Sequence, residues 1–255
     1  MLTKINFNLK KKINYFINRF LKDYEYIYLT SDLRGFIYEF NTDPEEICKI
    51  LFSELVKQKK TIIIPAFSFK NKGKFDIKKT KSNLGFMTKW ALKNLDHTRS
   101  EHPIFSVISI GKNKNIVKNI GKSAFGYNSI FYRLYFKKTS LMHFGRPFQL
   151  GNTVIHFVEQ ISGAYYRENI LIKTKVYSGK NFIGKYYSIF ARRGNLNNST
   201  YISNTKKIDK LLKKNRMIHQ LGNEKNLTNI SHIDMSSCVN FMCDQFNINN
   251  KLFIN

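Results

Sequence analysis

The chain has 255 residues, with 43 Lys and Arg against 17 Asp and Glu, which gives a formal charge of +26. Hydrophobic residues make up 42% and aromatic residues 15%, so the chain can bury a core and is not a disordered basic tail. The positive charge favours anionic partners (nucleic acid, an acidic membrane surface or phosphate-bearing small molecules) and disfavours a strongly cationic substrate. A compositional bias toward Lys, Asn, Ile, Phe and Tyr is the alternative source of this charge.

The compartment is indicated by the cysteines and by the hydropathy pattern. Cys48, Cys238 and Cys243 lack metal-binding spacing and fit a reducing compartment. No run reaches the roughly 18 apolar residues of a membrane span. The basic N-terminus has no unbroken apolar stretch, and the apolar residues from Ile13 to Leu21 recur at helical spacing. We expect a cytoplasmic protein with an amphipathic first helix and no membrane insertion; a helix lying on a membrane surface is the alternative.

The first half of the chain alternates predicted strands and helices. Tyr24–Thr30 and the apolar run Thr61–Phe67 are typical of strands, the second buried on both faces. Between them, Thr42 to Glu46 opens a helix that runs to about Gln58, with Pro44 early and acids in the first turn. Lys70–Lys81 is a basic loop, and Ser82 caps a helix that ends near Leu95.

The second half predicts further elements and a late hairpin. Strands are expected at Ile104–Ile110 and Thr139–Phe144, and helices at Asn152–Ile161, Ile208–Leu212 and Ser236–Phe246. Leu171–Tyr177 and Phe182–Ala191 flank the turn residues 178–181, which indicates a hairpin. The fold class is therefore α/β, a layered sheet flanked by helices with a late antiparallel hairpin. No linker divides the chain, so we expect one domain over residues 1–255.

One pair of side chains suggests general-base chemistry. Between Glu101 and Glu168 the only acid is Glu159, although that stretch holds nine Lys or Arg. Glu159 follows His156 by three residues, so both lie on one face of the predicted helix. A carboxylate there orients the imidazole and raises its basicity. The alternatives are a surface pair or a core histidine with a satisfied partner.

A second polar group precedes the strand at Ile104–Ile110. It consists of Arg99-Ser100-Glu101-His102-Pro103, with Ser106 three residues later. Polar groups at a sheet end are common ligand contacts in α/β folds. Ser106 is a candidate nucleophile without a readable base, and a simple turn before a strand is the alternative. No phosphate-binding glycine motif, nucleophile elbow or zinc motif is present.

Six segments, in order, resemble the antibiotic N-acetyltransferase family, whose best-known members are the aminoglycoside 3-N-acetyltransferases. Leu29-Thr30-Ser31-Asp32-Leu33 stands where the family has a strand followed by His-Ser-Ser-Leu, and Ile64-Pro65-Ala66-Phe67 resembles its MPTF strand end. The other four are Phe75-Asp76 before Ser82-Asn83-Leu84-Gly85, the Arg99–Val107 segment (RSxHPxxSV), Asn128–Leu134 (GSPFxRL) and Asn152–Glu159 (NTSLHLAE). The resemblance covers nearly the whole chain, loosely after Arg167.

The resemblance implies a CoA-dependent N-acyltransferase with direct transfer, no covalent acyl-enzyme and no metal. It makes His156 the base that removes a proton from the acceptor amine, with Glu159 orienting it. It places Ser31, Ser106, Val107 and the Ala66–Phe67 strand end along the pantetheine channel. Arg34 is our candidate for a CoA phosphate, because a guanidinium binds phosphate bidentately.

The sequence departs from the family where the acceptor would bind. Thr30-Ser31-Asp32-Leu33 loses a histidine and gains an acid, and the segment before the catalytic helix contains Arg146. Acids that would hold a polycationic drug are largely missing. We therefore expect an anionic acceptor, most simply a nucleotide-linked amino sugar for surface polysaccharide synthesis. The candidate acceptor contacts are Asp32, Asp76, Arg146 and Arg167, in a basic surround with Lys137 and Lys138.

Three other functions are kept as alternatives. The first is antibiotic resistance by aminoglycoside acetylation, in which Asp32, Asp76 and Glu159 would bind the drug. The second is nucleic-acid binding, because residues 170–223 hold twelve Lys or Arg, one acid and interleaved aromatic residues. The third, an inactive family member, is disfavoured by the presence of both His156 and Glu159. The sequence does not decide between a monomer and a dimer, and it does not name the acyl group.

Overall fold

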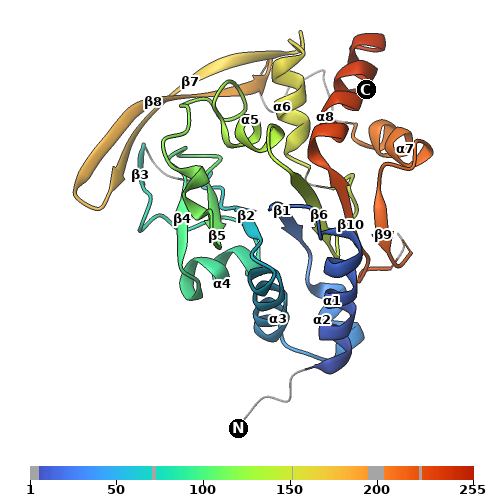
Figure 1. The fold of residues 1–255 in the computed structure, drawn as a ribbon. Helices are drawn as coiled ribbons and strands as arrows, with labels where there is room; N and C mark the ends of the chain where they lie inside the picture. The colour runs from blue at the N-terminus through green and yellow to red at the C-terminus, as the bar shows by residue number, and fades with distance from the viewer. Residues whose placement is uncertain (1–5, 71–72, 151, 195–203, 224–225) are drawn as a thin grey trace.

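A seven-stranded sheet with helices on both faces forms the body of the protein (Figure 1). The computed structural model describes residues 6–70, 73–150, 152–194, 204–223 and 226–255. The strand order is β4-β5-β2-β1-β6-β10-β9. The central strands β2, β1 and β6 are parallel, and the outer strands are antiparallel to their neighbours. These strands are β1 Tyr26–Ser31, β2 Thr61–Pro65, β4 His97–Arg99, β5 Val107–Ile110, β6 Thr139–Phe144, β9 His219–Leu221 and β10 Ile230–Asp234.

Two apolar layers cover the two faces of this sheet. In β1, Tyr26 and Tyr28 pack into one layer and Ile27 and Leu29 into the other, as the alternation of side chains along a strand requires. One layer contains the helices α1 Phe7–Phe20, α2 Arg34–Phe40, α3 Pro44–Lys57 and α4 Phe86–Asn94. The other contains α5 Ile130–Tyr135, α6 Val154–Ile161, α7 Lys206–Lys214 and α8 Met235–Ile248, with the 3-10 turn Lys114–Val117.

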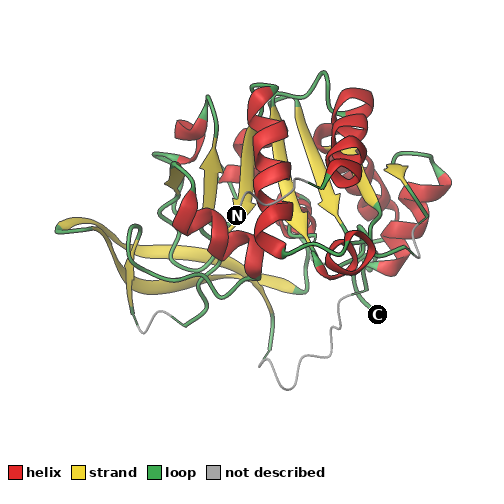
Figure 2. Ribbon diagram, turned by 90° about the horizontal axis from the view of Figure 1, so that it is seen from below, coloured by secondary structure: helices red, strands yellow, loops and turns green. Residues whose placement is uncertain are grey.

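A second, three-stranded sheet extends away from the body (Figure 2). Its order is β3-β7-β8, with the long hairpin β7 Arg167–Ser178 and β8 Asn181–Arg192. The strand β3 Lys74–Asp76 pairs in parallel with β7, so the predicted loop Lys70–Lys81 contains a strand that its polar composition did not indicate. The α/β class and the late hairpin are confirmed. In the described part of the chain, no helix has both the length and the apolar character that a membrane crossing needs.

Several predicted elements have different bounds in the structure. The strand predicted at Ile104–Ile110 begins only at Val107, because residues after Pro103 form a turn. The helix predicted from Ser82 begins at Phe86, because the Ser82 hydroxyl accepts a hydrogen bond from the N–H of Leu84 and donates one to the carbonyl of Phe67. The first helix and the helix at 44–57 lie where the sequence predicts them.

Candidate active site

His156 and Glu159 lie on α6, a short helix between the main sheet and the hairpin (Figure 1). Val154, Phe157 and Val158 bury the apolar face of this helix, which fixes the direction of the opposite face. Glu159 is 1% exposed, whereas the side chain of His156 is 31% exposed. The pair therefore has a buried acid and an imidazole that can be reached from outside.

The Glu159 carboxylate receives three side chains at once. His156 Nδ1 lies 2.8 Å from Oε2, and Arg167 Nε lies 2.7 Å from the same oxygen. The Tyr166 hydroxyl donates to Oε1 at 3.0 Å. Burial raises the pKa of Glu159, but the hydrogen bond and charge of His156 and the charge of Arg167 outweigh it and hold the pKa below its usual value. Glu159 is thus an ionised carboxylate, and both of its oxygens already contact protein side chains.

Arg167 lies behind this pair at the start of β7. It is 6% exposed, its Nη1 donates to the carbonyl of Phe190 at 2.8 Å, and its Nη2 lies 3.0 Å from His156 Nδ1. The sequence predicts Arg167 as an acceptor contact. In the structure its guanidinium is enclosed between β8 and Glu159 and is not among the side chains that line either cavity described below.

This network can make His156 a general base. Two groups compete at Nδ1: the Glu159 carboxylate at 2.8 Å favours the tautomer with a proton on Nδ1, and the Arg167 Nη2 donor at 3.0 Å favours the other. In the first tautomer Nδ1–H donates to Glu159, and the lone pair of Nε2 is available to accept a proton. The ring of Phe125 packs edge-on against the imidazole at 5.3 Å between centroids. The imidazole is therefore fixed by a polar network on one side and an aromatic ring on another.

A cavity of about 200 Å³ opens beside His156. It is lined by residues from the start of α6, the end of β8 and the C-terminal segment: Asn152, Thr153, Ile155, His156, Glu159, Arg192, Thr205 and Phe253. Glu159 is the one acid in this lining, and its charge faces Arg167. Arg192 adds a positive charge. A group bound in this cavity would lie next to the His156 ring.

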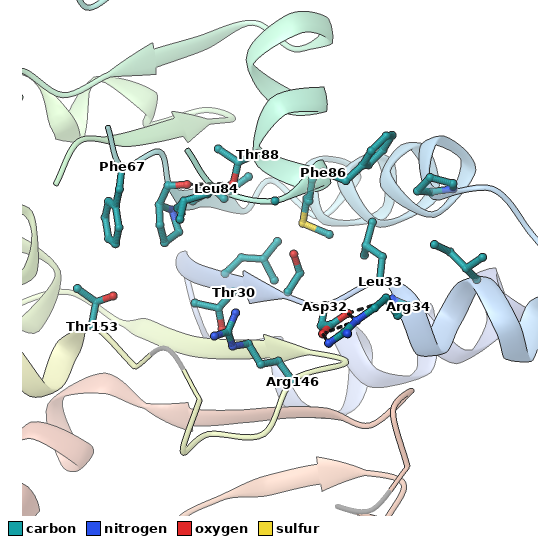
Figure 3. Close-up of a pocket in the computed structure, with 18 residues that line it drawn as sticks. Thr30, Asp32, Leu33, Arg34, Phe67, Leu84, Phe86, Thr88, Arg146 and Thr153 are labelled. Carbon is teal, nitrogen blue, oxygen red and sulfur yellow. Dashed lines mark hydrogen bonds and ion pairs between the residues drawn. The ribbon is translucent and has the colours of Figure 1, made fainter. Parts of the chain in front are cut away.

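A larger cavity of about 540 Å³ lies over the ends of β1 and β2 (Figure 3). Its walls are largely apolar, with Leu29, Ile64, Phe67 and Met87 among its lining residues. Thr153 lines both cavities and precedes His156 by three residues. In Figure 3, Thr153 lies at the opposite end of the cavity from Arg34.

Five of the predicted binding residues line this larger cavity: Ser31, Asp32, Arg34, Phe67 and Arg146. Arg34 binds the Asp32 carboxylate through Nη2 at 2.5 Å, and this hydrogen bond holds the pKa of Asp32 below its usual value. Arg146 donates from Nε to the carbonyl of Leu150 at 2.7 Å. Arg34 is 85% exposed, which places a solvent-facing guanidinium at the outer end of the cavity.

Four predicted residues lie elsewhere. Ala66, Ser106 and Val107 are fully buried, and the Ser106 hydroxyl donates to the carbonyl of Ala66 at 2.8 Å while accepting from Arg99 Nε at 3.1 Å. In this structure they hold two strands together and do not line the cavity. Asp76 is also outside both cavities, since its carboxylate accepts the N–H groups of Lys78 and Gly179 in the smaller sheet.

The polar segment before β5 has a structural role. His102 Nδ1 accepts the N–H of Phe105 at 3.0 Å, and Nε2 donates to the carbonyl of Ser188 in β8 at 3.1 Å. Burial lowers the pKa of His102 to about 4, so the ring is neutral. This histidine ties the main body to the hairpin that carries Arg167.

Three site residues escaped the sequence analysis. Tyr166 and Arg192 reach the site from outside α6, and no local spacing relates them to His156. Thr153 belongs to the family-like segment at 152–159, but nothing in the sequence marked its position between two cavities. Within the described residues, no group of three or more His, Cys, Asp or Glu is arranged to hold a metal ion.

Comparisons with known proteins identify the family. Three similar solved structures share the fold at low identity: the YokD protein from Bacillus subtilis (15% identity, TM-score 0.72, 94% of this chain and 99% of that one covered), AAC-IIIb in a binary complex with CoASH (10%, 0.75, 94% and 96%) and AAC-VIa bound to sisomicin (13%, 0.74, 94% and 97%). No curated protein matches the sequence. The family model described as aminoglycoside 3-N-acetyltransferase matches residues 30–247. The chain therefore belongs to the aminoglycoside 3-N-acetyltransferase family, which confirms the resemblance seen in its motifs.

Proposed function

We propose that the protein is an acyl-CoA-dependent N-acyltransferase that acts on the amine of an amino sugar, with His156 as general base. The observation that carries this proposal is the buried Glu159 carboxylate, which holds a reachable His156 beside one cavity, while Thr153 of the same segment lines both that cavity and the larger one. A neutral amine must lose one N–H proton as its nitrogen bonds to the acyl carbon, so a base in contact with the acceptor is required for attack on a thioester. Family membership supports the same reaction class.

The larger cavity fits an acyl-CoA. Its apolar walls suit the pantetheine arm, and Arg34 and Arg146 are placed to bind phosphate groups. When bound, acyl-CoA supplies an activated acyl thioester. The inner end of the cavity, at Thr153, would bring that thioester next to His156. A solved neighbour with CoASH bound supports this use of the fold.

Residues of this chain carry out the proton transfers and hold the groups in position. His156 Nε2 accepts a proton from the acceptor amine, and Glu159 stabilises the imidazolium that results. Arg167 and Tyr166 hold the Glu159 carboxylate in place. The same imidazolium then returns its proton to the departing thiolate, which leaves the base ready for another turnover.

Two acceptor classes are supported by different observations. The family description, and neighbours solved with sisomicin and with a gentamicin, favour an aminoglycoside. A nucleotide-linked amino sugar, as used in surface polysaccharides, is favoured by Arg192 in the lining beside His156 and by the use of Glu159 within the network.

A CoA-release assay with both classes of amine tests the proposal. The enzyme is mixed with acetyl-CoA and either kanamycin-type drugs or nucleotide-linked amino sugars, and free thiol is measured. Release that depends on the amine and is lost in His156→Ala supports the transferase. Release with drugs alone selects the aminoglycoside acceptor, and no release with any amine refutes the transferase itself.

A further inference from the structure

The side-chain hydroxyl of Thr153 does not cap α6, although Thr153 occupies the N-cap position. The usual role of a threonine at this position is to satisfy a free N–H of the first turn. Here the N–H of His156 is bonded to the Thr153 carbonyl at 3.0 Å, and that of Ile155 to the Asn152 carbonyl at 3.2 Å. The hydroxyl of Thr153 is therefore not needed by the backbone of the helix.

Thr153 also lies at both of the proposed binding sites, the one for acyl-CoA and the one for the acceptor amine. It lines the cavity that suits acyl-CoA and the cavity beside His156, and it is 8% exposed (Figure 3). An amine activated by His156 attacks a carbonyl carbon that lies about 3 Å from it, as near-attack geometry requires. With the acyl group at the Thr153 end of the larger cavity, the carbonyl oxygen would lie close to Thr153.

We propose that the Thr153 hydroxyl donates a hydrogen bond to the carbonyl oxygen of the acyl thioester and stabilises the charge that develops there. This inference rests on the proposed function. The amine nitrogen forms a bond to the carbonyl carbon, its proton passes to His156 Nε2, and the carbonyl electron pair moves to the oxygen facing Thr153. When the carbonyl re-forms, the carbon–sulfur bond breaks and the thiolate takes the proton from His156.

The local structure favours a side-chain donor over the backbone. At many helix N-termini the free N–H groups stabilise an oxyanion, but those of Ile155 and His156 are already bonded. Thr153 is largely enclosed, so a hydrogen bond from its hydroxyl meets little competition from water. In other enzymes, loss of one such donor from an oxyanion site costs about 10²–10³-fold in kcat.

The test compares Thr153→Val, which keeps the shape but removes the hydroxyl, with Thr153→Ser, which keeps the hydroxyl. We expect Thr153→Val to lower kcat about 10²-fold or more with KM for acetyl-CoA changed less than about threefold, and Thr153→Ser to restore most of the rate. Calorimetric titration with CoA and thermal melting should give the wild-type Kd and Tm for both variants. The slow hydrolysis of acetyl-CoA without any amine should fall by the same factor, because water attack develops the same charge.

Other results overturn the assignment. Wild-type kcat in Thr153→Val rejects the oxyanion role, as does a raised KM with unchanged kcat, which would indicate a binding contact only. Loss of Tm or of CoA affinity in Thr153→Val would indicate a structural role and also rejects it. A selective kcat loss in Asn152→Ala, with Thr153→Val unaffected, would move the donor to the neighbouring amide, whose Nδ2 has no hydrogen-bond partner within the described residues. If the wild type releases no CoA with any amine or water, the proposed function fails and this role fails with it.

Discussion

Replacing Glu159 with Gln removes the charge at the centre of the site while keeping the shape of the side chain. The Glu159 carboxylate is 1% exposed and faces the Arg167 guanidinium, itself 6% exposed, at 2.7 Å. An amide has one acceptor oxygen, so it can accept from Tyr166 or from His156 but not from both, and it leaves the positive charge of Arg167 buried without an opposite charge. Removing one partner of a buried ion pair costs about 3–5 kcal/mol, and because the amide keeps one of these hydrogen bonds, we expect about 3 kcal/mol.

The same substitution should lower the rate through His156. The imidazolium formed on proton transfer loses a carboxylate at 2.8 Å, and an amide can also select the wrong tautomer by donating to Nδ1. If the imidazolium loses as much stabilisation as Arg167, about 3 kcal/mol, kcat falls about 10²-fold at about 1.4 kcal/mol per factor of ten. KM for acetyl-CoA should change little, because Glu159 does not line the larger cavity.

The double variant Glu159→Gln, Arg167→Met separates the two effects. Met removes the buried charge that Gln leaves unmatched, so urea unfolding should recover much of the lost free energy of unfolding. Steady-state CoA release should stay low, because the imidazolium still has no carboxylate. A single variant within about 0.5 kcal/mol of wild type in stability and within about threefold in kcat would refute the view of Glu159 as an ionised, charge-balanced centre. Full recovery of kcat in the double variant would refute its role toward His156.

Three further outcomes are expected. His156→Ala should lower kcat by about 10²–10⁴-fold with an unchanged Tm, since the ring is partly exposed; near-wild-type turnover would remove it from the base role. Acid should destabilise the fold, because burial lowers the folded-state pKa of three histidines from an unfolded value near 6.5, to about 4, 3 and 4 for His102, His143 and His232. The unfolded chain therefore binds more protons than the folded chain below about pH 6.5. The free energy of unfolding, measured with urea, should be about 4 kcal/mol lower at about pH 5.5 than above about pH 6.5. A flat profile from about pH 7.5 to 5.5 would contradict this. Gly145→Ala should destabilise more than Gly163→Ala, because both glycines have positive φ but only a Cβ at 145 would lie 2.2 Å from the Asp32 carbonyl oxygen; equal unfolding midpoints would argue against that close approach.

The part of the site that the sequence could predict is local. His156 and Glu159 are three residues apart on a helix, and a spacing of three fixes their proximity whatever surrounds the helix. The central strand β2 was equally readable, because a strand buried on both faces appears as an uninterrupted apolar run. Both predictions depend only on neighbours along the chain.

The parts that the sequence could not predict depend on contacts between distant segments. Arg167 and Ser106 both carry polar groups that could contact a ligand. The packing of β7 against α6 places Arg167 beside Glu159, and the pairing of β5 with β2 buries Ser106. The short strands β4 and β9 contain mainly polar residues, so their pairing follows from neighbouring strands rather than from their own composition. The sequence does not predict β4 and β9 for the same reason that it does not predict the position of Arg167: both depend on contacts between distant segments.

The structure shows which positive side chains, out of a net charge of +26, line the two cavities. In the larger cavity Arg34 is matched by Asp32, and Arg146 remains as an added positive charge. In the cavity beside His156 the single acid is matched by Arg167 from behind, and Arg192 contributes another positive charge. Two unit charges about 7 Å apart interact by about 2 kcal/mol at an effective dielectric constant of about 20. At that distance from a bound acceptor, the Arg192 charge would favour a phosphate-bearing amine and disfavour a polycation, and the CoA-release assay with both classes of amine measures this preference.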